Sequence, residues 1–127
     1  FMHVYARLKD THPVTVVPGI TGMSAAWTAT GVPITWGDDA LSVVTGTLPE
    51  SRLIEKMHVS DAIVVMKVGQ HLAKVKRALK ATSRYEKAWL VQYAAMKQCK
   101  VQKLSDVKHN KTPYFSIIIV HGEGRRP

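Results

Sequence analysis

The chain alternates short apolar runs rich in β-branched residues with segments of helical periodicity, and this alternation limits the possible folds. Strands are predicted at residues 14–17, 41–44, 61–66, 89–91 and 115–120, with a shorter one at 101–104. Helices are predicted at residues 21–29, 49–57 and 68–79. Alternating strands and helices predict the α/β class, and the closely spaced late strands indicate a mixed β-sheet flanked by helices.

Size and composition predict one ordinary domain. With 127 residues, 46% hydrophobic and 21% charged, the chain can bury a core, and residues 1–127 are interpreted as a single unit. It has no apolar run near the roughly 20 residues that span a bilayer, and no signal-peptide layout, so a cytoplasmic location is expected. The single cysteine, Cys99, excludes an intrachain disulfide and is interpreted as a packed thiol.

The formal charge of +9 favours an anionic partner. The basic residues are spread over positions 52 to 111 without the aromatic or zinc-binding patterns of nucleic-acid modules, so nucleic acid is not the expected partner. A small polyanionic substrate is compatible with the charge. The basic residues of the helix predicted at 68–79 are interpreted as a solvated face.

Few side chains form a recognisable catalytic or metal-binding pattern. The six histidines lack metal-ligand spacing, and no metal is expected. Ser24 is not a nucleophile elbow because position 26 is Ala rather than Gly. The adjacent carboxylates Asp38 and Asp39 could serve as a base or as metal ligands, although such loop pairs are more typical of turns.

The segment from residue 14 to 29 reads as strand, turn and helix. Pro18 and Gly19 form the turn, and Thr21 is suited to cap the helix, which Gly31 and Pro33 end. The unpaired N–H groups of a helix N-terminus can hold a carboxylate or phosphate. On these residues alone, anion binding and plain helix capping remain equally good interpretations.

Taken together, the ordered segments resemble the tetrapyrrole (corrin/porphyrin) methylase family. The general signature is similar to VPGITGMSAA at 17–26 followed by GVPI at 31–34. The precorrin-2 C(20)-methyltransferase branch is similar to GDDALSVV at 37–44, TGTL at 45–48, IVVMKVG at 63–69 and PYFS at 113–116. After Pro33 the chain departs from the uroporphyrinogen methylase branch, which makes that branch a poorer match.

This resemblance implies a chemistry and a domain position. It implies methyl transfer from S-adenosyl-L-methionine, with S-adenosyl-L-homocysteine as product, to a meso carbon of precorrin-2 or its cobalt form in cobalamin biosynthesis. It further implies a small-molecule tetrapyrrole partner, no nucleic acid, no membrane and a homodimer. Residues 1–127 would be the C-terminal subdomain of the tetrapyrrole methylase fold. The N-terminal domain with its Gly-Asp-Pro loop is missing from these residues, so the fragment is expected to fold but to be inactive alone and to bind the cofactor weakly or not at all.

Site residues follow from the same resemblance. Cofactor contacts are expected at Thr21, Gly22, Met66 and Ala94, and substrate contacts at Asp38 and Asp39. Lys67 and Arg84 are candidates to meet substrate carboxylates, and no catalytic residue is assigned. Alternative functions are another methylase of this fold, such as a precorrin-3B or precorrin-4 methylase, a diphthine synthase or a ribosomal RNA methyltransferase, and thirdly a non-enzymatic basic binding module.

Overall fold

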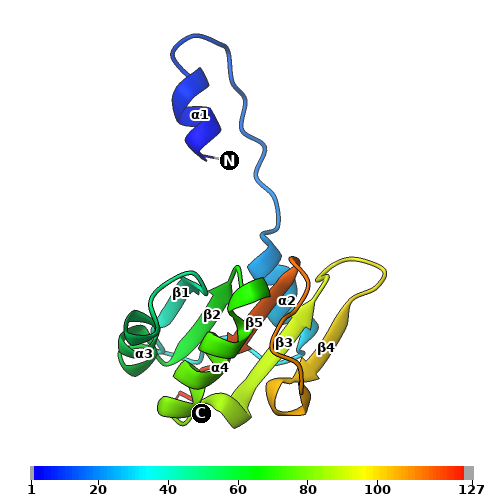
Figure 1. Ribbon diagram of the computed structural model, residues 1–127. Coiled ribbons are helices and arrows are strands. Elements are labelled where there is room, and N and C mark those ends of the chain that lie inside the picture. The colour runs from blue at the N-terminus through cyan, green and yellow to red at the C-terminus, as the bar shows by residue number, and fades with distance from the viewer. Residues whose placement is uncertain (1, 125–127) are drawn as a thin grey trace.

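The computed structural model describes residues 2–124 and contains a five-stranded sheet with helices on both faces (Figure 1). The strands lie in the order β1-β2-β5-β3-β4. β1 and β2 are parallel, and every other neighbouring pair is antiparallel. The predicted α/β class with a mixed sheet is therefore confirmed. The strands are β1 (Leu41–Thr45), β2 (Ala62–Met66), β3 (Ala88–Gln92), β4 (Lys100–Lys103) and β5 (Ser116–Val120).

Two helices cover one face of the sheet and one covers the other. α3 (Glu50–His58) and α4 (Leu72–Ala81) share the face with the larger core, and α2 (Gly22–Ala29) packs on β3 and β5 from the opposite side. Three short 3-10 turns, Gly69–His71, Tyr85–Lys87 and Leu104–Asp106, connect these elements. In the part of the chain that the structure describes, no helix has the length and apolar character needed to cross a bilayer.

The central strand β5 carries side chains into both cores. Ile118 and Val120 join the core beneath α3 and α4, whereas Ile119 packs beside Ala26 of α2. All three side chains are almost completely buried. A strand covered on both faces needs apolar residues at every position rather than at alternate ones, which accounts for the continuous run in its sequence.

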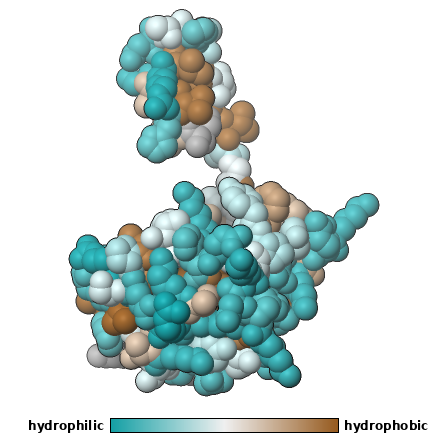
Figure 2. Space-filling view, viewed as in Figure 1, coloured by the Kyte–Doolittle hydropathy of each residue, from teal (hydrophilic) through white to brown (hydrophobic). Residues whose placement is uncertain are grey.

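The N-terminal segment extends away from the sheet. Figure 1 shows α1 (Met2–Leu8) at the end of an extended stretch of residues 9–20, and Figure 2 shows apolar side chains on the surface of α1. The predicted strand at 14–17 is wrong, because these residues pair with no other strand among residues 2–124. A strand needs a neighbouring backbone for its N–H and C=O groups, and Val17 is 84% exposed.

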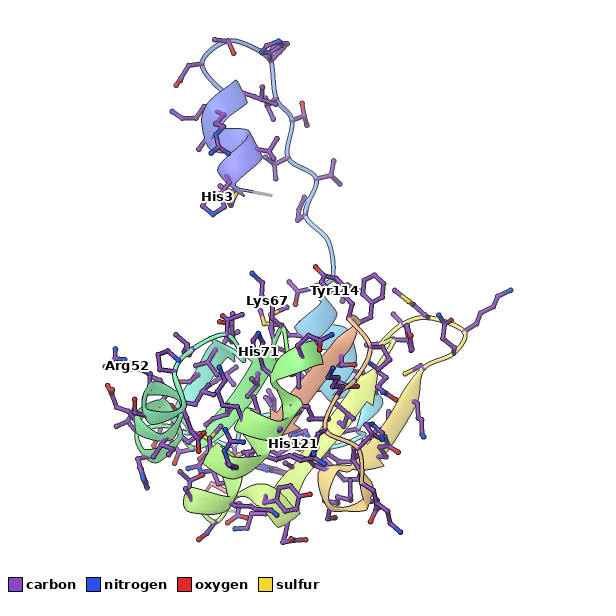
Figure 3. All side chains as sticks on the ribbon, in the orientation of Figure 1. His3, Arg52, Lys67, His71, Tyr114 and His121 are labelled. Carbon is purple, nitrogen blue, oxygen red and sulfur yellow. The ribbon has the colours of Figure 1, made fainter. Side chains whose placement is uncertain are left out.

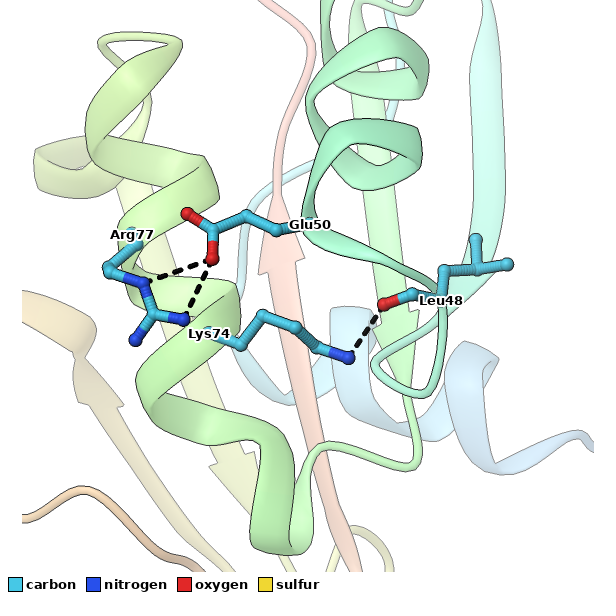
Figure 4. Close-up of polar contacts among 4 residues, drawn as sticks. All are labelled: Leu48, Glu50, Lys74 and Arg77. Carbon is cyan, nitrogen blue, oxygen red and sulfur yellow. Dashed lines mark hydrogen bonds and ion pairs between the residues drawn. The ribbon is translucent and has the colours of Figure 1, made fainter.

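The basic residues of α4 make specific contacts with the neighbouring loop and helix (Figure 4). The Lys74 ammonium donates to the carbonyl of Leu48 at 2.6 Å, and the Arg77 guanidinium pairs with Glu50 at 2.7 Å. The predicted solvated face is therefore only partly right: Arg77 is mostly exposed, but Lys74 helps to fix the turn that follows β1. α3 packs directly beside α4, so these long side chains reach partners that sequence periodicity does not reveal.

Cys99 lies in the loop between β3 and β4. Its side chain is exposed, so the prediction of a packed thiol is wrong. This loop reaches beyond the sheet (Figure 1), and residues 95–100 are all exposed.

Lys76 is the basic residue of α4 that is buried. Its ammonium donates to the carbonyls of Val107 and of His109, the latter at 2.9 Å, and holds the segment that leads to β5. Burial, followed by repulsion from Lys80, lowers the Lys76 pKa from its ordinary value.

We expect Lys76→Met to lower the free energy of unfolding by about 1 to 3 kcal/mol, because the buried carbonyl of Val107 and the part-buried carbonyl of His109 lose their donor. The measurement is urea unfolding monitored by circular dichroism. Lys80→Met is the matched control on the same helix, since the Lys80 ammonium is exposed and contacts only the Tyr85 ring among the described residues. Equal losses in the two variants would contradict the assigned role of Lys76.

Candidate functional site

The sheet has a cavity at each end. Strand register places Met66, Gln92 and Ser116 at one end, and Ala62, Ala88 and Val120 at the other. The first end carries a cavity of about 390 Å³ with mainly apolar walls, which we call the upper cavity. Its walls are formed by Gly22, Met66, Lys67, Val91, Ala94, Met96, Tyr114, Phe115, Ser116 and Ile117. The volume lies in the range typical of small-molecule sites.

The start of α2 forms one wall of the upper cavity. Thr21 caps the helix, because its hydroxyl accepts a hydrogen bond from the backbone N–H of Ser24 at 3.2 Å. Gly22 is the first helical residue, and a Cβ there would meet only the Ile117 side chain, at 3.9 Å. The predicted cap is thus confirmed, and Ser24 belongs to the capping turn.

The end of β2 forms a second wall. Met66 is the last strand residue, and Lys67 follows it in the left-handed backbone region with φ 53°. Next to this turn, the Gly46 N–H donates to the Met66 carbonyl at 2.7 Å. A Cβ at position 46 would lie 3.0 Å from the Lys67 carbonyl oxygen, so glycine permits this close approach.

The chain after β3 forms a third wall through a tight turn. The Met96 N–H donates to the Tyr93 carbonyl at 2.9 Å, and Ala94 lies between them. Tyr93 and Ala95 both have positive φ, 54° and 61°. Left-handed geometry at non-glycine residues costs roughly 1 kcal/mol or more each, and such strain concentrates at functional sites.

The segment entering β5 closes the cavity. Tyr114 and Phe115 stack edge to face with ring centroids 5.2 Å apart. Behind them, the Gln92 amide donates to the Thr112 hydroxyl at 2.8 Å, and that hydroxyl lies 2.9 Å from the Ser116 hydroxyl. Gln92 and Ser116 are buried, so this polar chain fixes the strand ends behind the apolar wall.

Three of the four residues predicted to contact a cofactor line this one cavity. They are Gly22, Met66 and Ala94, which come from α2, β2 and the turn after β3, and Thr21 directly precedes Gly22. Lys67, the weaker candidate for substrate contact, lines the same cavity. Sequence reasoning did not single out Val91, Met96, Phe115 and Ile117, because apolar residues at strand ends have the same pattern as core residues.

Asp38 and Asp39 lie at the opposite end of the sheet. They line a second, polar cavity of about 690 Å³, which we call the lower cavity, together with Arg84 and His121. The Asp39 carboxylate accepts from the Trp36 N–H at 3.0 Å and fits closely against Gly122, where a Cβ would lie 2.0 Å away. The structure therefore does not bring this acidic pair to the residues of the upper cavity.

The charged groups of the lower cavity are largely paired within the protein. The Arg84 guanidinium donates to the carbonyls of Ser60 and Asp61 at 2.5 and 2.9 Å, and Lys87 pairs with Glu123 at 2.6 Å. Arg84 thus connects the turn before β2 to the end of α4. No group of three or more His, Cys, Asp and Glu that could hold a metal occurs within residues 2–124.

His121 joins the end of β5 to the chain after α2. Its Nδ1 donates to the Pro33 carbonyl at 2.9 Å, and its Nε2 lies 3.0 Å from the Thr30 hydroxyl. Burial lowers the His121 pKa below its ordinary value, with repulsion from Lys103 adding to the effect and the Pro33 hydrogen bond opposing it.

Comparison with known proteins identifies relatives over nearly the whole chain. The family model for tetrapyrrole (corrin/porphyrin) methylases matches residues 1–107. A precorrin-2 C(20)-methyltransferase from Sinorhizobium sp is 41% identical over 127 residues, which is 100% of this chain and 52% of that protein. The cobalamin biosynthesis protein CobIJ of Mycobacterium bovis is 36% identical over 126 residues, covering 99% of this chain and 25% of that protein.

Solved structures share the fold. The methyltransferase CobJ superposes with a TM-score of 0.71 at 16% identity, covering 99% of this chain and 60% of its own. Uroporphyrin-III C-methyl transferase from Thermus thermophilus, solved with S-adenyl homocysteine, gives 0.65 at 22% identity, covering 94% and 57%. The chain thus spans about half the length of the Sinorhizobium relative and little more than half of these structures.

The lowered pKa of His121 predicts a loss of stability in acid. Because the unfolded chain takes up a proton near pH 6.5 and the folded chain does so only at lower pH, the free energy of unfolding should fall as the pH drops below 6.5. Urea unfolding at a series of pH values measures this slope. We expect a shallower slope in His121→Gln than in the wild type, and an equal slope in the two would contradict the role assigned to His121.

Proposed function

The chain belongs to the tetrapyrrole methylase family, and we propose that it forms the C-terminal part of an S-adenosylmethionine-dependent precorrin-2 C(20)-methyltransferase. The observation that carries this proposal is the upper cavity, whose walls include Gly22, Met66 and Ala94 from three separate elements. The 41% identity to the Sinorhizobium enzyme over the whole chain supports the choice of substrate.

The upper cavity suits the cofactor in size and chemistry. An adenosine group and a thioether present mostly apolar surface, which Met66, Val91 and Ile117 can contact. The missing Cβ of Gly22 leaves room beside the first turn of α2, where backbone N–H groups have no partner within the helix. Thr21 orders this turn through its cap. The thermophilic relative solved with S-adenyl homocysteine has the same fold, which supports the cofactor.

When bound, the cofactor supplies an electrophilic methyl group on a sulfonium, and transfer to carbon is a direct displacement. The protein's part is then to align the two reactants and to exclude water. The apolar walls and the aromatic pair Tyr114 and Phe115 contribute to both alignment and water exclusion, because they shape the cavity and carry few groups that bind water. No residue of this chain is assigned as a catalytic base.

The proposal includes the position of this chain in the whole enzyme. The residues form one wall of the cofactor cleft, and a second domain forms the other, which agrees with the chain's span of 52% of the Sinorhizobium protein. In this proposal, precorrin-2 or its cobalt form is the substrate in cobalamin biosynthesis, and the enzyme is a cytoplasmic homodimer. Asp38 and Asp39 line the lower cavity, so they can contact the substrate only if the tetrapyrrole or a partner reaches that cavity.

A titration with S-adenosylhomocysteine tests the cofactor site. We expect weak, saturable binding at millimolar ligand, with the amide NMR signals of Ala94 and Ile117 shifting and those around Asp39 unchanged. Gly22→Leu should abolish these shifts while the fold stays intact, because the side chain enters a cavity rather than a packed core. Gly19→Leu is the matched control, since a Cβ there meets nothing within 4 Å. Shifts confined to the lower cavity would refute the assignment.

Reconstitution tests the reaction. The chain should be co-expressed with the part of the Sinorhizobium enzyme that it does not match, and methyl incorporation into precorrin-2 measured by mass spectrometry. We expect transfer of one methyl group by the pair and none by this chain alone. A pair that associates and binds S-adenosylhomocysteine but leaves precorrin-2 unmodified would exclude the proposed substrate.

A further inference from the structure

We propose that Lys67 binds a carboxylate side chain of the tetrapyrrole at the edge of the upper cavity, an inference that rests on the function proposed above. Lys67 both lines this cavity and is exposed. Figure 3 shows Lys67, His71 and Tyr114 along the same end of the sheet, facing away from the lower cavity and His121.

Lys67 differs from most other basic residues near the sheet in having no partner within the protein. Across residues 2–124, no hydrogen bond, ion pair or ring contact involves its ammonium group. By contrast, partners within the protein engage Arg52, Lys74, Lys76, Arg77, Lys80, Arg84, Lys87 and Lys103. The other candidate for substrate carboxylates, Arg84, is therefore committed to backbone carbonyls at the opposite end of the sheet. Among the described residues that line the upper cavity, Lys67 is the cation that a ligand can pair with.

The backbone at Lys67 lies in the left-handed region. Its φ of 53° is unfavourable for lysine, and Asn or Gly would adopt it at lower cost. Gly46 packs against the same turn, with its Cβ position 3.0 Å from the Lys67 carbonyl oxygen and 3.3 Å from the His71 Cβ. The chain therefore has room only for glycine at position 46 beside this turn.

Polar groups beside Lys67 suit a carboxylate. Thr45 at the end of β1 is level with Met66 in the strand register, and its hydroxyl lies 2.7 Å from the hydroxyl of Thr47. His71 is half-buried, and its Cβ would lie 3.3 Å from a Cβ at position 46, beside the turn that holds Lys67. The upper cavity thus has mainly apolar walls with the Lys67 ammonium at its edge, so a substrate carboxylate can pair with Lys67 while the cofactor occupies the apolar interior.

The test measures binding of uroporphyrin III, a stable tetrapyrrole with carboxylate side chains, by quenching of tryptophan fluorescence in the full 127-residue chain. Lys67→Asn should weaken binding about fivefold, the effect of losing one partly solvated ion pair. It should not destabilise the fold, because Asn tolerates positive φ. Lys67→Arg should keep most of the affinity. Lys108→Asn removes the same charge from an exposed loop position and should leave the affinity unchanged.

The possible outcomes separate this inference from the proposed function. Equal affinities for Lys67→Asn and Lys108→Asn, or no binding of uroporphyrin III by the wild-type chain, would overturn the role of Lys67. Neither result touches the cofactor titration, which is measured on the wild-type chain and is followed at Ala94 and Ile117. Weaker uroporphyrin binding by Lys67→Asn, with Lys67→Arg and Lys108→Asn close to the wild type, would establish Lys67 as a substrate contact.

Discussion

The fold depends on the insertion of β5 between β2 and β3. This last strand pairs antiparallel with both neighbours, so one backbone joins the parallel pair β1 and β2 to the hairpin of β3 and β4. In the strand register, Ser116 at the start of β5 lies at the same end of the sheet as Met66 and Gln92. Val120 at the end of β5 lies at the opposite end, with Ala62 and Ala88. Without this strand, the three walls of the upper cavity would belong to separate units.

Several basic side chains of the described residues bind partners within the protein. Lys76 and Arg84 hold loops through backbone carbonyls, and Arg77 pairs with Glu50. These side chains carry part of the excess of basic residues, but they are already engaged by partners within the protein. The basic residues therefore do not form one continuous surface of the kind that binds nucleic acid in general. A single cation near a cavity, such as Lys67, is the more specific place for an anionic ligand.

Backbone geometry also separates the two ends of the sheet. Three of the four described non-glycine residues with positive φ, namely Lys67, Tyr93 and Ala95, lie at or beside the upper cavity, and the fourth, Ser83, lines the lower one. Such strain persists only where surrounding contacts compensate for it. Here the paired strands and the chain of Gln92, Thr112 and Ser116 provide these contacts.

Local sequence determined the strand and helix segments of the sheet domain, the Thr21 cap and the membership of the family. Periodicity, capping and ordered motifs each depend on residues that are close together in the sequence. It failed at residues 14–17, whose strand needs a partner, and at Cys99, whose exposure depends on the loop around it. Only the tertiary structure shows that Gly22, Met66 and Ala94 line one cavity and that Asp38 and Asp39 lie at the opposite end of the sheet. The physical reason is that strand order and direction fix which distant residues meet, and these depend on long-range pairing that no local pattern encodes.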